Sequence, residues 1–438
     1  MKPGSGYMAK LIRRFLGVDL FRISSINAIS VFFRLIFSYA TNKAVVMWLG
    51  PTGTALTEQL RNLVQGVQGV STLGIGEAIT RYTSLYRKRD KRLKAFLKRS
   101  GRLILYISIV LGLVIFFGAA PLSRMLFKTD EYVFVLRMVG LFTPVYAYQM
   151  LLNAMLNGLE QYKKIVYINI IFHAVGFLAM VMFILWRHME GALLAVALTP
   201  VLAFLFSAVV LEPKDLRLLA APLSNGAKGM NAFGKRIWPF IGMALTSAIS
   251  IPLFTIMLRN NIIDYYGAEG MVYAGYWDAI RKISAFYFMF ITPVFAMHYF
   301  PRISRLSDPR DWRREMTAML KYLYPLFMGG FVLIYLLRRW ITLFIFSGEY
   351  LPVNDLYGWQ LTADAIRLLS LLLAYRMWAK GMTVRFVFAE LSYWVFYLSL
   401  AHFFLQVRGL TGVMEALVWA NAYYLILMLI YFGNLLKK

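Results

Sequence analysis

Apolar runs long enough to cross a membrane recur from one end of this 438-residue chain to the other. A helix needs about 20 residues to cross a hydrocarbon core of about 30 Å, and these runs are about 17 to 25 residues long. Because the runs have helix length, they favour a helical bundle over a β-barrel. We therefore expect an all-α polytopic membrane protein with twelve transmembrane helices. The expected spans are 23–48, 60–80, 103–120, 132–156, 165–186, 191–211, 237–258, 275–298, 317–337, 359–378, 386–405 and 414–434.

The distribution of basic residues predicts how these spans are oriented. The chain has 47 Lys and Arg against 21 Asp and Glu, which gives a formal net charge of +26. In a soluble protein this charge would indicate nucleic acid as a partner. Here the connections on one side carry 31 of the basic residues and those on the other side carry 7. Cytoplasmic loops are the ones enriched in Lys and Arg, so we expect both termini in the cytoplasm and no nucleic-acid partner.

The residue types that hold metals and form disulfides are scarce. The chain has no Cys and only four scattered His. This composition excludes disulfides and thiolate metal sites and disfavours a His-based one. We expect no metal site and no cofactor.

The chain divides into two halves of six spans. Residues 1–22 have no signal-peptide pattern, and their mixture of basic and apolar residues predicts an amphipathic cytoplasmic segment on the membrane surface. The longest cytoplasmic connection, 212–236, contains Pro and Gly and is the expected linker. It separates an N-lobe at 23–211 from a C-lobe at 237–434, and 435–438 form a cytoplasmic tail.

A weak internal repeat relates these two lobes. Phe127 aligns with Phe346 and Tyr132 with Tyr350, and in both lobes these residues follow a basic loop and an apolar span. Because six spans return the chain to its starting side, the repeats are parallel about an axis along the membrane normal. Such repeats favour a central cavity with alternating access.

The stretch 267–308 combines an apolar span with charges inside it. Asp278, Arg281 and Lys282 lie in the first turns of the eighth span. A charge inside a membrane span is costly unless it faces water or a partner, so these residues indicate a functional site. Asp278 and Lys282 are four residues apart and are expected to pair, which would leave Arg281 as an uncompensated cation.

Polar side chains recur at helical spacing in several other spans. Arg34 lies near the middle of the first span, where an unpaired cation costs about 2.5–3.5 kcal/mol. Arg34, Arg61 and Arg281 have no obvious carboxylate partner in their own helix. Arg forks suit phosphate oxygens, so a lumen of this sign favours an anionic substrate. The candidate binding residues are Arg34, Arg61, Arg137, Arg281, Lys282, Arg367, Gln65 and Asn153.

These residues also have structural interpretations. Asn, Gln and Ser in membrane helices join helices more often than they bind a ligand. Asp364 with Arg367 fits a structural ion pair as well as a functional one. Carboxylates within spans are the candidates for coupling to a proton or sodium gradient, which the sequence leaves open. They are Glu77, Asp278, Asp364, Glu390 and Glu415.

Three stretches resemble the Wzx-type flippases of O-antigen and enterobacterial common antigen, in the polysaccharide branch of the MOP exporter superfamily. They are LGPTGTA after the first span, GEAITRYTSLY after the second, and YYGAEGMVYAGYWDAIRKISAFYFMFITPVFAMHYFPRISRLSD. The resemblance implies two six-helix lobes around a central cationic cavity. It also implies transport of undecaprenyl-pyrophosphate-linked oligosaccharide across the bacterial inner (plasma) membrane. Membrane lipids, a polysaccharide polymerase and a chain-length regulator are the other implied partners. Arg34, Arg61, Arg281 and Lys282 are the residues that this resemblance would place around the pyrophosphate.

Two other classes of membrane protein compete with this interpretation. An ion-coupled exporter of toxic compounds from the same superfamily would carry cations, so buried carboxylates should outnumber buried Arg and Lys. A membrane glycosyltransferase or polymerase would need a catalytic carboxylate in a large outer loop, and the longest outer loop here, 338–358, is short. The sequence also has no phosphate-binding Gly-Lys-Ser/Thr loop and no catalytic constellation. We therefore expect a transporter and not an enzyme.

Overall fold

The computed structural model describes residues 18–437 except 75, 87–89, 221–230, 296–298 and 307. Within these residues the chain is helical and contains no strand. The helices are α2 (Val18–Ser71), α3 (Gly76–Tyr86), α4 (Asp90–Phe117), α5 (Ala119–Phe127), α6 (Val133–Gly158), α7 (Tyr162–Ser207), α8 (Pro213–Leu219), α9 (Asn231–Tyr266), α10 (Gly270–Val294), α11 (Phe300–Arg305), α12 (Pro309–Leu336), α13 (Arg338–Ile345), α14 (Tyr357–Lys380) and α15 (Thr383–Lys437), with 3-10 turns η2 (Gly267–Glu269) and η4 (Gly348–Leu356). The predicted amphipathic segment lies almost wholly outside the described residues.

Three helices each contain two membrane crossings. α2 breaks at Gly50, α7 at Arg187 and His188, and α15 at Gly409, where the backbone leaves helical geometry. Gly50 has φ 60° and is followed by Pro51, so the break falls inside the LGPTGTA stretch. Together with α4, α6, α9, α10, α12 and α14, the described chain has the twelve crossings that the sequence predicts.

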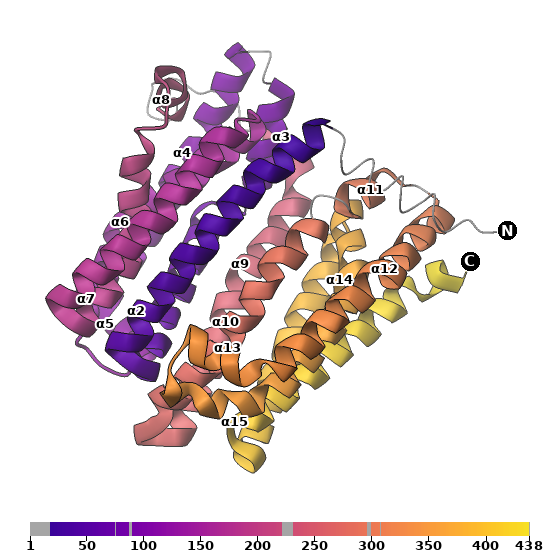
Figure 1. The fold of residues 1–438 in the computed structure, drawn as a ribbon. Coiled ribbons are helices and arrows are strands. Elements are labelled where there is room, and N and C mark those ends of the chain that lie inside the picture. Colours follow the sequence, from indigo (N-terminus) through magenta and orange to yellow (C-terminus); the bar gives the residue numbers. More distant parts are fainter. Residues whose placement is uncertain are drawn as a thin grey trace.

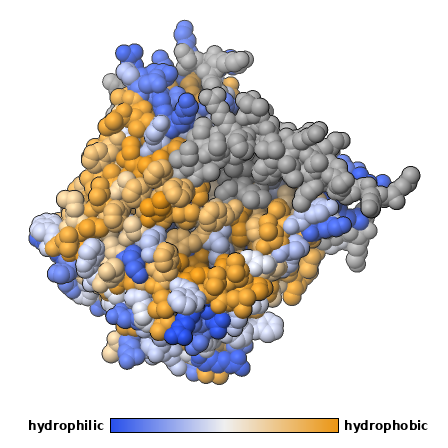
Figure 2. Space-filling model, viewed as in Figure 1, coloured by the Kyte–Doolittle hydropathy of each residue, from blue (hydrophilic) through white to orange (hydrophobic). Residues whose placement is uncertain are grey.

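The hydropathy of the helices agrees with a multi-pass membrane protein. Six described helical stretches are long and apolar enough to cross a bilayer, and three of these run for 46 to 52 residues, enough for two crossings each. Figure 2 shows apolar residues over the middle of the molecule and hydrophilic residues at its two ends. Within the described residues, α2 and α14 are less apolar than these six stretches and are not among them. Both helices line the cavity described below, which explains their polar residues.

The spans form two lobes that lie side by side (Figure 1). Helices α2 to α7 form the N-lobe, and α9 to α15 form the C-lobe. α9 and α10 lie between them and pack against α2, so these three helices make the central contact between the lobes. One large apolar cluster fills the C-lobe, and two smaller clusters fill the N-lobe.

The internal repeat has a structural counterpart at the end of each lobe that carries α5 or α13. Each of these short helices follows a long span, α4 or α12. Phe127 packs against Tyr132 with ring centroids 5.4 Å apart, and Phe346 packs against Tyr350 at 4.9 Å. All four side chains are buried. The residues that align in the sequence therefore occupy equivalent places in the two lobes.

Hydrogen bonds tie the lobes together at the end that carries α13. Tyr39 of α2 donates to the carbonyl of Phe344 at 3.0 Å. Lys43, one turn further along α2, donates to the same carbonyl at 3.2 Å and also to the carbonyl of Phe346. The C-terminus of a helix carries partial negative charge, so the ammonium group of Lys43 is well placed against the end of α13.

Close contact between α10 and α2 requires glycine at residue 275. A Cβ atom on Gly275 would lie 2.2 Å from the carbonyl oxygen of Pro51. Gly275→Ala is therefore expected to lower the free energy of unfolding by about 1–3 kcal/mol, because the two backbones must separate. Thermal unfolding of the purified protein measures this effect. Gly330→Ala is the matched control, since nothing lies within 4 Å of its added Cβ. Equal melting temperatures for the two variants would contradict the prediction.

Candidate functional site

A large cavity lies between the two lobes. Its volume is about 1240 Å³, and α2, α7, α9, α10, α14 and α15 supply its walls. Sites for drug-sized ligands usually measure about 300–1,000 Å³, so this cavity accommodates something larger. The described charged residues that line it are the cations Arg34, Arg61, Arg281, Lys282 and Arg367 and the carboxylates Glu58, Asp364 and Glu390. Basic groups outnumber acidic groups by five to three, so the cavity is cationic.

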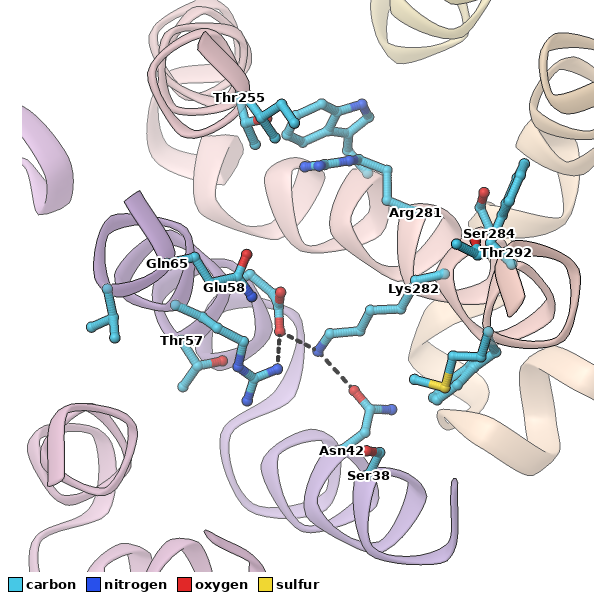
Figure 3. Close-up of a pocket in the computed structure, with 18 of the residues that line it drawn as sticks. Ser38, Asn42, Thr57, Glu58, Gln65, Thr255, Arg281, Lys282, Ser284 and Thr292 are labelled. Carbon is cyan, nitrogen blue, oxygen red and sulfur yellow. Dashed lines mark hydrogen bonds and ion pairs between the residues drawn. The ribbon is translucent and has the colours of Figure 1, made fainter. Parts of the chain in front are cut away.

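Glu58 is the centre of an ion-pair cluster that joins the lobes. Its Oε1 lies 2.5 Å from Arg61 in the same helix and 3.1 Å from the Nζ of Lys282 in α10. Lys282 also donates to Oδ1 of Asn42 in α2 at 2.8 Å. Figure 3 shows Lys282 extending from α10 across the cavity to Glu58 and Asn42. The cluster places two cations beside one carboxylate.

This cluster corrects two predictions. Asp278 and Lys282 do not pair, because Lys282 extends to the other lobe. Arg61 does have a carboxylate partner in its own helix, since Glu58 lies three residues earlier. The sequence contained this signal, but the expected second span began at residue 60 and so left Glu58 in a loop. In the structure α2 is helical on both sides of Glu58, and the spacing of three brings the two side chains together.

Asp278 forms a second, fully buried ion pair. Its two oxygens accept hydrogen bonds from Nε and Nη2 of Arg259 at 2.9 and 2.7 Å. Arg259 is 0% exposed and Asp278 is 2% exposed. Gln59 accepts a third, weaker hydrogen bond from Arg259 at 3.4 Å. The expected seventh span ended at residue 258 and so left Arg259 outside it, but α9 continues to Tyr266 and carries Arg259 into the contact between the lobes.

Arg281 lies between this buried pair and the cavity. It is 3.6 Å from Asp278, and its guanidinium lies 4.5 Å from the ring centroid of Trp277. Figure 3 shows Arg281 and Lys282 extending from α10 in different directions. Asp278 is already bound by Arg259, so it compensates Arg281 only in part. The prediction that Arg281 has no carboxylate partner in its own helix is wrong, because Asp278 lies beside it. Arg281 nevertheless keeps part of its charge uncompensated and lines the cavity.

Asp364 sits in the C-lobe wall of the cavity. Its Oδ2 accepts hydrogen bonds from Ser284 of α10 at 2.7 Å, from Gln360 at 2.8 Å and from Tyr287. Arg367 does not form the expected ion pair with it in the described structure and instead lies 5.0 Å from the ring of Phe288. Hydrogen bonds from neutral donors therefore hold the carboxylate in place and leave Arg367 available to the cavity.

Arg34 is a cavity-lining cation with an unused nitrogen. Its Nε is buried and has no hydrogen-bond partner in the structure. No ion pair joins Arg34 to a carboxylate in the part of the chain that the structure describes. A buried donor without a partner is costly, so this guanidinium is suited to receive an anionic ligand. Gln65 also lines the cavity and is exposed within it.

Three of the predicted residues do not contribute to the described cavity wall. Arg137 is exposed and lies 6.0 Å from the ring of Phe116, and Asn153 is half-buried on α6 and does not line the cavity. Another polar residue of α6, Tyr146, joins two helices instead of binding a ligand, because its hydroxyl group donates to the carbonyl of Ala197 in α7 at 2.6 Å. Asp278 is buried in its pair with Arg259 and does not line the cavity. The candidate Glu77 lies outside the side chains that the structure describes.

Comparisons with known proteins agree with this architecture. No family model matches the chain. It is 27% identical over 402 residues to the lipid III flippases of Escherichia coli (strain K12) and Shigella flexneri, covering 91% of this chain and 94% of each relative. Its fold is similar to an inward-facing multidrug resistance MATE family transporter of the MOP superfamily, with a TM-score of 0.73, 16% identity and coverage of 92% and 96% of the two chains. A MOP superfamily transporter from Pyrococcus furiosus, whose binding pocket is described as having reverse polarity, matches with a TM-score of 0.62 at 16% identity and covers 95% and 96%. The chain therefore has the architecture of a multi-pass membrane protein, shares its fold with the solved transporters of the MOP superfamily, and is similar over nearly its full length to lipid III flippases.

Proposed function

We propose that this protein flips an undecaprenyl-pyrophosphate-linked oligosaccharide, the repeat unit of O-antigen or a related surface polysaccharide, across the bacterial inner membrane. The observation that carries the proposal is the large cavity between the lobes, in which five cations face three carboxylates. A pyrophosphate group needs several cationic donors, and an oligosaccharide needs volume. The similarity to lipid III flippases supports a lipid-linked oligosaccharide as the cargo.

The pyrophosphate binds, in this proposal, beside Glu58. Arg61 and Lys282 share this one carboxylate, and Arg34 has a free Nε. When the lipid enters, its phosphate oxygens replace the single Glu58 carboxylate as partner of the two cations. Charge-assisted hydrogen bonds are worth more than neutral ones, so phosphate competes effectively for these donors.

Transport proceeds by alternating access of the two lobes. Both termini and the linker at 212–236 face the cytoplasm, so α5 and α13 lie at the periplasmic end. The contacts of Tyr39 and Lys43 with the C-terminus of α13 close that end before the lipid enters. Because Lys282 also connects the lobes through Glu58, binding of the pyrophosphate removes one contact between them. This coupling of binding to lobe separation gives the cargo a direct influence on the conformational equilibrium.

An exporter of cationic compounds is the rival function on the same fold. Asp364 and Glu390 line the cavity and are the groups that such a pump would use for cargo or for coupling. The excess of Arg and Lys opposes a cationic cargo. Coupling to an ion gradient is a separate property of Asp364 and Glu390, and transport that persists without any ion gradient would exclude it.

Reconstituted vesicles test the proposal. We expect Arg34→Ala, Arg61→Ala and Arg281→Ala each to reduce flipping of the lipid-linked oligosaccharide by at least about tenfold, because each removes a charged donor of about 1.5–3 kcal/mol. Arg339→Ala is the control, since this exposed residue in the first turn of α13 does not line the cavity. Transport that survives all three cavity substitutions in correctly inserted protein would exclude the proposal.

A further inference from the structure

The C-lobe half of the cavity contains a group of aromatic side chains. Tyr393, Trp394 and Tyr397 come from one stretch of α15, and Tyr424 comes from the second half of that helix. The Tyr393 ring lies 5.3 Å from Trp394 and 5.6 Å from Tyr424, in edge-to-face contact with both. Phe254 of α9 stacks on Trp394 at 5.7 Å with an interplanar angle of 9°. The indole is thus held firmly while it lines the cavity.

Hydrogen-bond acceptors lie among these rings. Glu390 accepts from the indole nitrogen of Trp394 at 3.2 Å, and this carboxylate also lines the cavity. Asp364 is 2% exposed and Gln360 is 4% exposed. The Oε1 atom of Gln360 is buried without a hydrogen-bond partner, while its Nε2 is occupied by Asp364. This acceptor in the cavity wall is free to receive a hydrogen bond from a hydroxyl group of a ligand.

The chemistry of this group differs from that of the cationic cluster around Glu58. Aromatic faces bind the apolar C–H face of a sugar ring, and carboxylate or amide oxygens accept hydrogen bonds from its hydroxyl groups. Asp364 and Glu390 repel a phosphate, and Arg367, the cation near both of them, offsets only part of their charge. The two clusters therefore suit the two parts of one amphipathic headgroup, a charged part and a neutral polyhydroxyl part.

Helix α10 connects the two clusters. Lys282 extends to Glu58 of the N-lobe, and Ser284, two positions later, donates to Asp364 of the C-lobe at 2.7 Å. Figure 3 shows Lys282 on the side of α10 that faces α2, with Ser284 further along the helix and away from that cluster. A ligand that contacts both clusters therefore spans the cavity across α10.

We propose that Gln360, Asp364, Glu390, Trp394 and Tyr424 form a sugar-binding subsite for a neutral sugar of the cargo, separate from the pyrophosphate site. The inference rests on the proposed function, because it assigns a second part of the same substrate to a second part of the same cavity. It explains why carboxylates line an otherwise cationic lumen. It also makes this subsite the determinant of selectivity among lipid-linked sugars.

The test measures selectivity with two lipids. Purified full-length protein in nanodiscs is titrated with undecaprenyl pyrophosphate and with the same lipid bearing a neutral N-acetylhexosamine disaccharide. The readout is the ratio of the two dissociation constants. We expect Trp394→Leu and Gln360→Leu each to lower the preference for the sugar-bearing lipid about tenfold. Each substitution removes a side chain that contacts the sugar, and a site built to bind a sugar discriminates less once such a contact is lost. Trp394→Phe, which keeps an aromatic face, is expected to retain most of it.

Controls separate this inference from the proposed function. Trp419→Leu, on the same helix but 55% exposed and outside the cavity wall, should keep the wild-type ratio. If Lys282→Met weakens both lipids while Trp394→Leu, Gln360→Leu and Tyr424→Leu leave the ratio unchanged, the pyrophosphate site stands and the sugar subsite is overturned. If neither lipid binds the wild-type protein, the proposed function fails. Binding of tetraphenylphosphonium that is lost in Glu390→Gln would overturn the sugar assignment in favour of a cationic ligand.

Discussion

Lys282→Met is expected to weaken binding of undecaprenyl pyrophosphate by about 10–100-fold, and flipping should fall by a similar factor. Lys282 contacts Glu58 and Asn42 across the cavity, so its ammonium is the cation of the C-lobe that reaches the N-lobe cluster. A hydrogen bond to a charged group is worth about 1.5–3 kcal/mol, which corresponds to this range of affinity. Methionine is unbranched and one atom shorter than lysine, and it removes the ammonium group together with its charge and its hydrogen-bond donors. Lipid titration in nanodiscs measures the affinity, and a vesicle assay measures flipping.

Glu58→Gln distinguishes a binding role from a structural one. If Glu58 competes with phosphate for Arg61 and Lys282, its neutralisation should strengthen lipid binding, in the direction opposite to Lys282→Met. If the Glu58 cluster only holds the lobes together, both substitutions should lower stability and weaken binding alike. Weaker lipid binding in Glu58→Gln, with the fold intact, would contradict the competition that we propose.

Asp278→Ala is expected to lower the free energy of unfolding by about 3–5 kcal/mol. The substitution leaves the guanidinium of Arg259 buried at 0% exposure with neither of its two charge-assisted hydrogen bonds to Asp278. Removing one partner of a buried ion pair has this cost because the remaining charge cannot be solvated. Denaturation of the purified protein measures the change. Asp130→Ala is the matched control, because it breaks an exposed pair with Arg124 and should cost less than about 1 kcal/mol.

Replacing both partners of the buried pair should restore much of the loss. The double variant Arg259→Met with Asp278→Leu fills similar volume without a buried charge, and such replacements are often neutral. Its recovery relative to Asp278→Ala would show that the unpaired charge, and not the lost contact between α9 and α10, destabilises the single variant. A double variant as unstable as Asp278→Ala would contradict this account.

The sequence predicted the architecture of the described chain well because membrane helices follow local rules. The length of each apolar run predicted one membrane crossing. Gly50 and Gly409 mark two of the breaks between crossings, where the backbone adopts positive φ. The repeat predicted the equivalence of Phe127 and Phe346, which the two lobes confirm. Helical spacing also predicted that Arg34, Arg61 and Arg367 each lie on the polar face of their own span. All three line the cavity.

The partners of the charged residues were decided by tertiary structure. Lys282 lies 240 positions from Asn42 in the sequence, and Arg259 lies 200 positions from Gln59, yet both pairs are in contact. Spacing within one helix could propose only Asp278 as the partner of Lys282. A buried charge takes the partner that satisfies it with the best geometry, and for Asp278 that is the two-pronged guanidinium of Arg259 on the adjacent helix. The sequence by itself therefore determined how many helices cross the membrane and which of their faces are polar. Only the packing of α9 and α10 against α2 decided which charges are neutralised in the contact between the lobes and which remain free to bind a ligand.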